Sequence, residues 1–130
     1  MVSFLLPGVA RAAYYGDETD YAVVSLSTPA AYGQWYICAS TYGAEACFMP
    51  DGELFFVKDT FADGRSAAAD WWYYGNRYRS RARVNQHGYG TWAICNKSFV
   101  EHGDMVVRAM VYEGGNPIYD TDTWQINTET

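Results

Sequence analysis

The chain has 130 residues, of which 49% are hydrophobic and 18% are charged. These proportions exclude a disordered chain, and the length fits one domain that is large enough to bury a core. The formal net charge is −6, so a general nucleic-acid binder, which is normally basic, is not expected. Aromatic residues make up 18% of the chain and 12 glycines break it into short runs, which is typical of an all-β protein.

Residues 1–12, MVSFLLPGVARA, resemble the second half of a secretory signal. A short apolar core at residues 4–6 is followed by a Pro-Gly break and by the A-x-A pattern of residues 10–12. We therefore expect a secreted, extracellular protein whose mature chain begins near Ala13. An ordinary apolar strand or arm is the alternative. No other run approaches the roughly 20 apolar residues of a membrane span.

The next stretch, residues 13–20, reads AYYGDETD. It is polar and contains a glycine, so we expect a flexible arm ahead of a single domain formed by residues 21–130. Tyr14 and Tyr15 are suited to a groove on a partner protein, and an extended arm can add a strand to an exposed sheet edge. A leftover of processing is the competing interpretation.

Short apolar or alternating runs, separated by turn residues, predict about eight strands and no helix. The expected fold is an antiparallel β-sandwich with hairpin or Greek-key connections. Besides an arginine-rich run, the expected strands cover residues 21–27, 34–39, 45–49, 54–58, 66–73, 89–96, 105–112 and 118–126.

Residues 53–98 contain the strongest turn signals. These are Asp63-Gly64, Gly75-Asn76 and the segment 87–90, HGYG. Each is expected to close a β-hairpin, which would make this stretch a meander of strands.

One run of this stretch alternates arginines with small or apolar residues: Arg77, Arg79, Arg81 and Arg83. Because side chains on a strand alternate between two faces, the four arginines are expected to share one solvent-facing side. That side could dock phosphate, carboxylate or an acidic partner. The alternative is pairing with acids of neighbouring strands, such as Asp59, Asp70 and Asp104.

Residues 71–74, WWYY, are four consecutive aromatics. On a strand, one alternate pair is expected in the core. Trp72 and Tyr74 are then available as a sugar platform or a protein interface, unless both faces of the sheet are covered.

The three cysteines, Cys38, Cys47 and Cys95, fit one disulfide and one leftover thiol. Cys38 and Cys47 flank a Tyr-Gly turn that could bring them together, while Cys95 could pair with either one. All three connectivities remain open. Because the chain has no C-x-x-C pair, a zinc site is not expected.

Asp59, Asp63 and Asp70 match part of the spacing of a calcium loop. Phe61 occupies a position where an oxygen ligand is needed, and no flanking helices are predicted. We interpret the spacing as an ordinary turn and expect no bound metal.

Nucleophilic catalysis has three candidate residues, Cys95, His87 and His102. Both histidines adjoin glycine in expected turns, where they need no catalytic explanation. No G-x-S-x-G motif is present. We therefore expect neither enzymatic activity nor a cofactor.

The stretch from Cys47 to Trp124 contains GELFFVKDT, ADGRSA, HGYGTWAICN and EHGDMVVRA. This set resembles a family of small secreted actinobacterial proteins, chiefly Streptomyces-like. Some members look like the adaptor subunit of umbrella toxins, in which a small β-domain links a long toxin subunit to a lectin-bearing subunit. The resemblance implies a secreted β-sandwich that works by protein–protein contact. Family members often have further cysteines near Arg83 and Met110, which this chain lacks.

The function expected from the sequence is therefore a non-enzymatic secreted adaptor or binding module, with larger secreted protein subunits as partners. A carbohydrate-binding, lectin-like domain is one alternative. A small secreted enzyme inhibitor, acting through a protruding loop, is the other.

Overall fold

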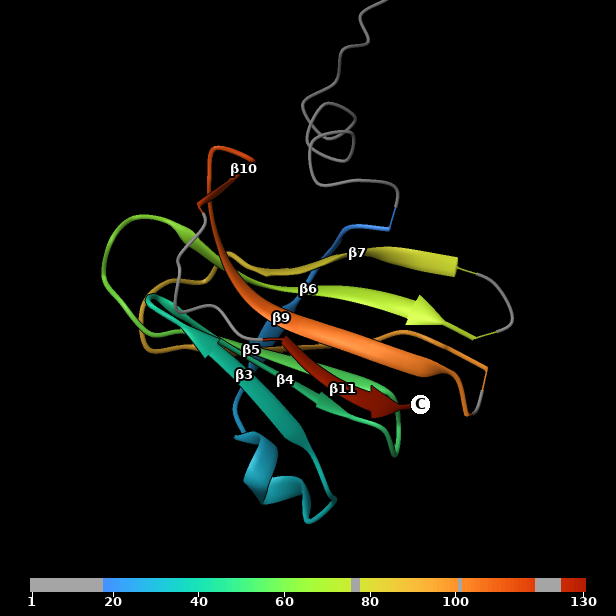
Figure 1. Cartoon of the computed structure of the whole chain (residues 1–130). Helices are drawn as coiled ribbons and strands as arrows, with labels where there is room; N and C mark the ends of the chain where they lie inside the picture. The colour runs from blue at the N-terminus through green and yellow to red at the C-terminus, as the bar shows by residue number, and fades with distance from the viewer. Residues whose placement is uncertain (1–17, 76–77, 101, 119–124) are drawn as a thin grey trace, which may run out of the picture.

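The computed structural model describes residues 18–75, 78–100, 102–118 and 125–130. In this part the chain is mostly β-strand, with one short 3-10 helix (η1, Pro29–Tyr32), and it forms two sheets packed together (Figure 1). The expectation of an all-β chain is therefore confirmed. No helix in the described ranges is long and apolar enough to cross a membrane.

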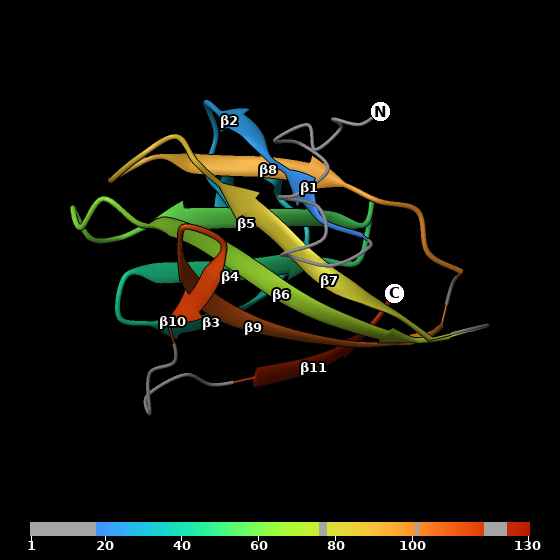
Figure 2. The same cartoon turned by 90° about the horizontal axis from the view of Figure 1, so that it is seen from above.

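Sheet A has the strand order β1-β7-β6-β9-β10, and β11 also pairs with β9. Sheet B has the order β2-β8-β5-β4-β3. Neighbouring strands are antiparallel except for β1 and β7, which are parallel. Figure 2 shows the strands of sheet A crossing over those of sheet B. The strands are β1 (Asp20–Tyr21), β2 (Val23–Ser25), β3 (Ile37–Thr41), β4 (Ala44–Met49), β5 (Leu54–Asp59), β6 (Ser66–Tyr74), β7 (Tyr78–Asn85), β8 (Trp92–Asn96), β9 (Asp104–Glu113), β10 (Asn116–Ile118) and β11 (Gln125–Glu129).

The first and last expected strands are each divided in two. Residues 21–27 do not form one strand, because the chain leaves sheet A after β1 and joins sheet B as β2. At the other end, β10 and β11 both pair with β9, and residues 119–124 between them lie outside the described residues. The described chain therefore has eleven strands rather than about eight.

Only one of the three expected hairpins is present, between β6 and β7. Residues 60–65 carry the chain from β5 in sheet B to β6 in sheet A, and residues 86–91 carry it back from β7 to β8. The expected meander is therefore wrong. An Asp-Gly or His-Gly turn gives the same local sequence signal in two situations. The next strand can pair with the previous one in the same sheet, or the chain can cross the roughly 10 Å to the other sheet.

The main core lies between the sheets and is rich in aromatic rings. Trp71 of β6 contacts Phe55 of β5, and Phe99 packs against both of these rings and against Tyr73 of β6. Burying each such side chain stabilises the fold by roughly 1.5–3 kcal/mol. Small residues on the same inner faces let the sheets approach: Ala44, Ala46, Ala67, Ala69 and Ala109.

The outer face of each sheet also carries a buried apolar cluster. On sheet B, Phe56 packs with Cys47 and Met49, and Tyr32 of η1 contacts the Phe56 ring edge-on at 5.2 Å. On sheet A the cluster consists of Ala68, Ala82, Val84, Met110 and Tyr112. Apolar residues on both faces explain why several strands read as continuous apolar runs rather than alternating ones.

Candidate functional site

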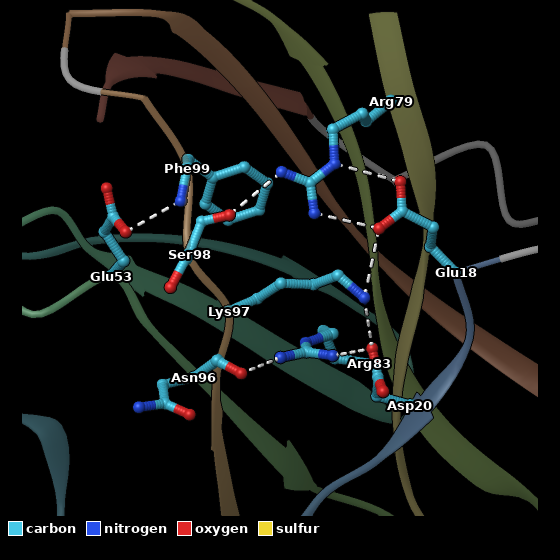
Figure 3. A network of polar contacts seen from close by, with 9 residues as sticks. All are labelled: Glu18, Asp20, Glu53, Arg79, Arg83, Asn96, Lys97, Ser98 and Phe99. Atoms are coloured by element: carbon cyan, nitrogen blue, oxygen red, sulfur yellow. Dashed lines mark hydrogen bonds and ion pairs between the residues drawn. The ribbon is translucent and has the colours of Figure 1, made fainter.

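Two arginines of the predicted docking face, Arg79 and Arg83, lie in a network of charges at one edge of the two sheets. Figure 3 shows where the network forms, between β7, the segment around β1 and the chain that leaves β8. We call this cluster the edge network, and its charged members are Glu18, Asp20, Arg79, Arg83 and Lys97.

Arg79 forms two parallel hydrogen bonds with the Glu18 carboxylate. Its Nε donates to Glu18 Oε2 at 3.0 Å, and a terminal nitrogen donates to Oε1 at 2.9 Å. The other terminal nitrogen donates to the Ser98 carbonyl at 2.9 Å, and the guanidinium lies 4.7 Å from the centre of the Phe99 ring. Bidentate Arg–carboxylate pairs of this kind are among the strongest polar contacts in proteins. Arg79 therefore fixes the backbone around Glu18.

Arg83 lies deeper, with only 1% of its side chain exposed. It donates to the Asp20 carboxylate and to the Asn96 carbonyl, and its guanidinium sits 5.4 Å from the centre of the Phe55 ring. Lys97 joins both acids, at 3.1 Å from Glu18 and 2.9 Å from Asp20. Three cations thus hold the two acids that precede the first sheet crossing.

The prediction of a solvent-facing arginine side is wrong for Arg79 and Arg83. In the register of β6 and β7 they lie opposite Tyr73 and Ala69, on the inner face of sheet A, while the small residues of β7 face outward. Alternation separates the two faces of a strand but does not say which one is inside. Arginines can occupy the inner face here because acids are supplied there.

The acids that pair with Arg79 and Arg83 are Glu18 and Asp20. The sequence assigns both to the flexible arm, yet they anchor it, and Asp20 begins β1. Among the other residues predicted to bind a partner, Arg81 is the register partner of Trp71. Tyr14, Tyr15 and Arg77 lie outside the described residues.

Glu18 should make the stability of the fold depend on acidity. The hydrogen bond from Arg79, above all, and the neighbouring Lys97 lower the pKa of Glu18 from 4.5 to about 2. A lowered carboxyl pKa contributes stability above the unfolded value of 4.5, and this contribution is lost as the pH falls toward 2. We expect Glu18→Gln to lower the free energy of unfolding by about 1 kcal/mol at pH 7, allowing for partial solvent screening, and by almost nothing near pH 2.

Denaturant unfolding of both proteins from pH 2 to pH 7 measures this difference. A constant gap over that range would show that Glu18 contributes packing rather than charge.

The expected alternation of the four aromatics is confirmed. Trp71 and Tyr73 are fully buried, Trp72 is half-buried and Tyr74 is 53% exposed. The Trp72 ring lies 5.3 Å from the guanidinium of Arg108 on the outer face of sheet A. Trp72 and Tyr74 therefore reach the surface on a face that already holds a cation.

The disulfide joins Cys38 and Cys47, one of the three pairings left open by the sequence. These residues are direct partners in the β3–β4 register, so the bond lies on the outer face of sheet B. Cys95 is a free thiol, and burial raises its pKa to about 11. A thiol with that pKa is almost wholly protonated at neutral pH and is a poor nucleophile.

Neither histidine is joined to this thiol by a hydrogen bond within the described ranges. His87 Nε2 lies 2.7 Å from the Ala22 carbonyl, and His102 Nδ1 lies 3.2 Å from Glu129 Oε1. The three candidates for nucleophilic catalysis therefore stand apart, each with its own surroundings.

The three aspartates of the calcium-like spacing are also divided. Asp59 and Asp63 line a hollow between the loops at residues 60–65 and 86–91. Asp70 lies on β6, where its carboxylate accepts a hydrogen bond from the Tyr112 hydroxyl at 2.8 Å. Asp59 Oδ1 and Asp63 Oδ1 each accept a bond from the backbone two residues later, which is the ordinary turn contact expected.

Two groups of residues in these sites were not identified from the sequence. Lys97 and the acids of the edge network are one group, and Asn85, which ties the 86–91 loop to β5, is the other. The sequence signal for the first was the acidic stretch GDETD at residues 16–20, whose charge is opposite to that of the distant arginine run. Comparison of the chain with protein-family models, with curated proteins and with solved structures finds no match.

Proposed function

We propose that the protein is a non-enzymatic, secreted binding module with a β-sandwich fold, and that it acts as an adaptor. In this proposal residues 13–17 engage a larger secreted protein. The resemblance to umbrella-toxin adaptors supports the same class of function.

The observation that carries the proposal is that the last residues of the arm are held by ion pairs. Glu18 and Asp20, directly after residues 13–17, are held by Arg79, Arg83 and Lys97. Holding a binding segment at its base lowers the conformational entropy lost when a partner orders the rest of it. An ion-paired segment that follows two adjacent tyrosines in the sequence, residues 14 and 15, therefore suits recognition of a groove.

The test is co-purification of the secreted protein, followed by mass spectrometry of what binds. We expect a much larger partner at fixed stoichiometry, and we expect deletion of residues 13–17 to abolish its capture without changing the melting temperature. Sparing Glu18 keeps these ion pairs intact. Trp35→Ala, which removes an exposed aromatic residue elsewhere in the sequence, is the control and should retain the partner. Full capture by the deleted protein would move the interface to the sheets.

Carbohydrate binding is the second candidate, favoured by the exposure of Tyr74 beside the half-buried Trp72. A lectin-like module would bind polysaccharide without a protein partner, and Trp72→Ala would abolish that binding. Sedimentation with insoluble polysaccharide, run on the same purified protein, separates the two functions.

A further inference from the structure

A hollow of about 430 Å³ opens at the end of the molecule opposite the β6–β7 hairpin. It is lined by the loops that join β5 to β6 and β7 to β8. Both loops lie at the left of Figures 1 and 2. Loops at one end of packed sheets are a common location for binding sites because the strands hold them rigidly. The residues that line it include Asp59, Phe61, Asp63, Arg65, Gln86 and Tyr89.

Asp59 is the buried acid of this hollow, with 3% of the residue exposed. Its Oδ1 accepts a hydrogen bond from the Phe61 amide at 3.2 Å, and Asp59 lines the hollow. Burial, together with the charge of Asp63, raises the pKa of Asp59. A cation placed in the hollow would relieve both effects.

Asp63 is held by its own loop, and that loop is tied to the β3–β4 turn by a backbone hydrogen bond. Its Oδ1 accepts the Arg65 amide at 2.9 Å, and Thr60 donates to the Gly43 carbonyl at 3.1 Å. A Cβ on Gly43 would lie 3.5 Å from Asp63 Oδ2 and 3.0 Å from Val111 Cγ2, and Gly43 has a φ of 102°. Glycine at this position therefore allows the turn to approach the second acid.

Arg65 is the only cation among the described residues that line the hollow, and its charge is already engaged. Arg65 Nε donates to Glu113 Oε1 at 3.1 Å, on β9. The two carboxylates of the hollow thus face a space whose own cation is paired elsewhere.

Aromatic rings complete the hollow. Phe61 is 44% exposed and Tyr89 is 64% exposed, and Tyr42 braces Phe61 edge-on with ring centres 4.6 Å apart. Carboxylates combined with exposed ring faces suit an organic cation, which gains both charge pairing and cation–π contact. Calcium is disfavoured because it needs six to eight oxygen ligands, and Phe61 and Tyr89 supply ring surface instead.

We propose that this hollow binds an organic cation with an ammonium or guanidinium head, through Asp59, Asp63 and the rings of Phe61 and Tyr89. The site is independent of the arm and of the adaptor function. The head group can come from a small amine or from a lysine or arginine side chain of a polypeptide.

The test is titration of the full chain with n-butylammonium and ethylguanidinium, followed by NMR of the Phe61 and Tyr89 ring resonances. We expect saturable shifts with a Kd of about 1 mM, and no saturation with n-butanol, the neutral analogue. Asp59→Asn should weaken binding about tenfold, as should Asp63→Asn if the first variant fails to fold. Asp51→Asn, in an exposed turn, is the matched control and should bind as the unmodified protein does.

A blocked Ala-Lys-Ala peptide distinguishes the source of the cation. Tighter binding than butylammonium indicates a polypeptide ligand, and equal or weaker binding indicates a small amine. The proposal is overturned if butanol saturates the site equally well, if both Asn variants keep full affinity, or if calcium or a sugar saturates the site where the amines do not.

Discussion

Replacing Asn85 by alanine is expected to lower the free energy of unfolding by about 3 kcal/mol, a large part of the stability of a domain of this size. Asn85 is fully buried at the end of β7. Its Nδ2 donates to the carbonyls of Val57 and Thr91, both at 2.9 Å, and its Oδ1 accepts the His87 amide at 2.8 Å. Alanine would leave these three backbone groups without the partner that Asn85 provides.

Denaturant unfolding measures the loss, and Asn96→Ala is the matched control. Asn96 also ends a strand, but it is exposed, and Arg83 contacts its backbone carbonyl rather than its side chain. We expect the control to change stability by no more than about 0.5 kcal/mol. Similar values for the two variants would show that the side chain of Asn85 does not hold the loop at residues 86–91.

The positions of most strands could be predicted from the sequence, because period-two alternation and glycine-bearing turns are local signals. The Ala-rich start of β6 was correctly placed in a strand although it could pass for a helical turn. The connections could not be predicted in the same way. The turn at Asp63-Gly64 crosses between sheets, and whether a turn crosses depends on partners far along the chain.

For the candidate sites, too, local sequence patterns predicted which residues share a face but not which distant residues they contact. The alternation of arginines correctly grouped Arg79 with Arg83, since both face inward from β7. It could not show that these arginines face the interior, because this depends on Glu18 and Asp20. These acids lie 61 and 63 positions away from Arg79 and Arg83 in the sequence. The hollow combines Asp59 with Tyr89, and no local pattern brings those two residues together.

Replacing Asp20 by alanine is expected to lower the free energy of unfolding by about 2–3 kcal/mol. The cause is the partner left behind: Arg83 is 1% exposed, and its Nε already has no hydrogen-bond partner within the described residues. Without Asp20 the buried guanidinium keeps only the Asn96 carbonyl among its hydrogen bonds. The estimate lies below that for a fully buried pair because 43% of the Asp20 side chain is exposed.

The double variant Asp20→Ala/Arg83→Met distinguishes two causes of the stability loss. One is the buried charge of Arg83 left without its counter-ion, and the other is lost packing. Methionine fills much of the arginine volume and needs no counter-charge, so we expect it to recover stability to within about 1 kcal/mol of the unmodified protein. Glu113→Gln is the control, since Glu113 pairs with Arg65 at the surface and should contribute less than about 1 kcal/mol. If the double variant is as unstable as the sum of its single changes, the two residues act independently. Arg83 would then owe its inward position to its contact with Phe55, 5.4 Å away, rather than to the acid of β1.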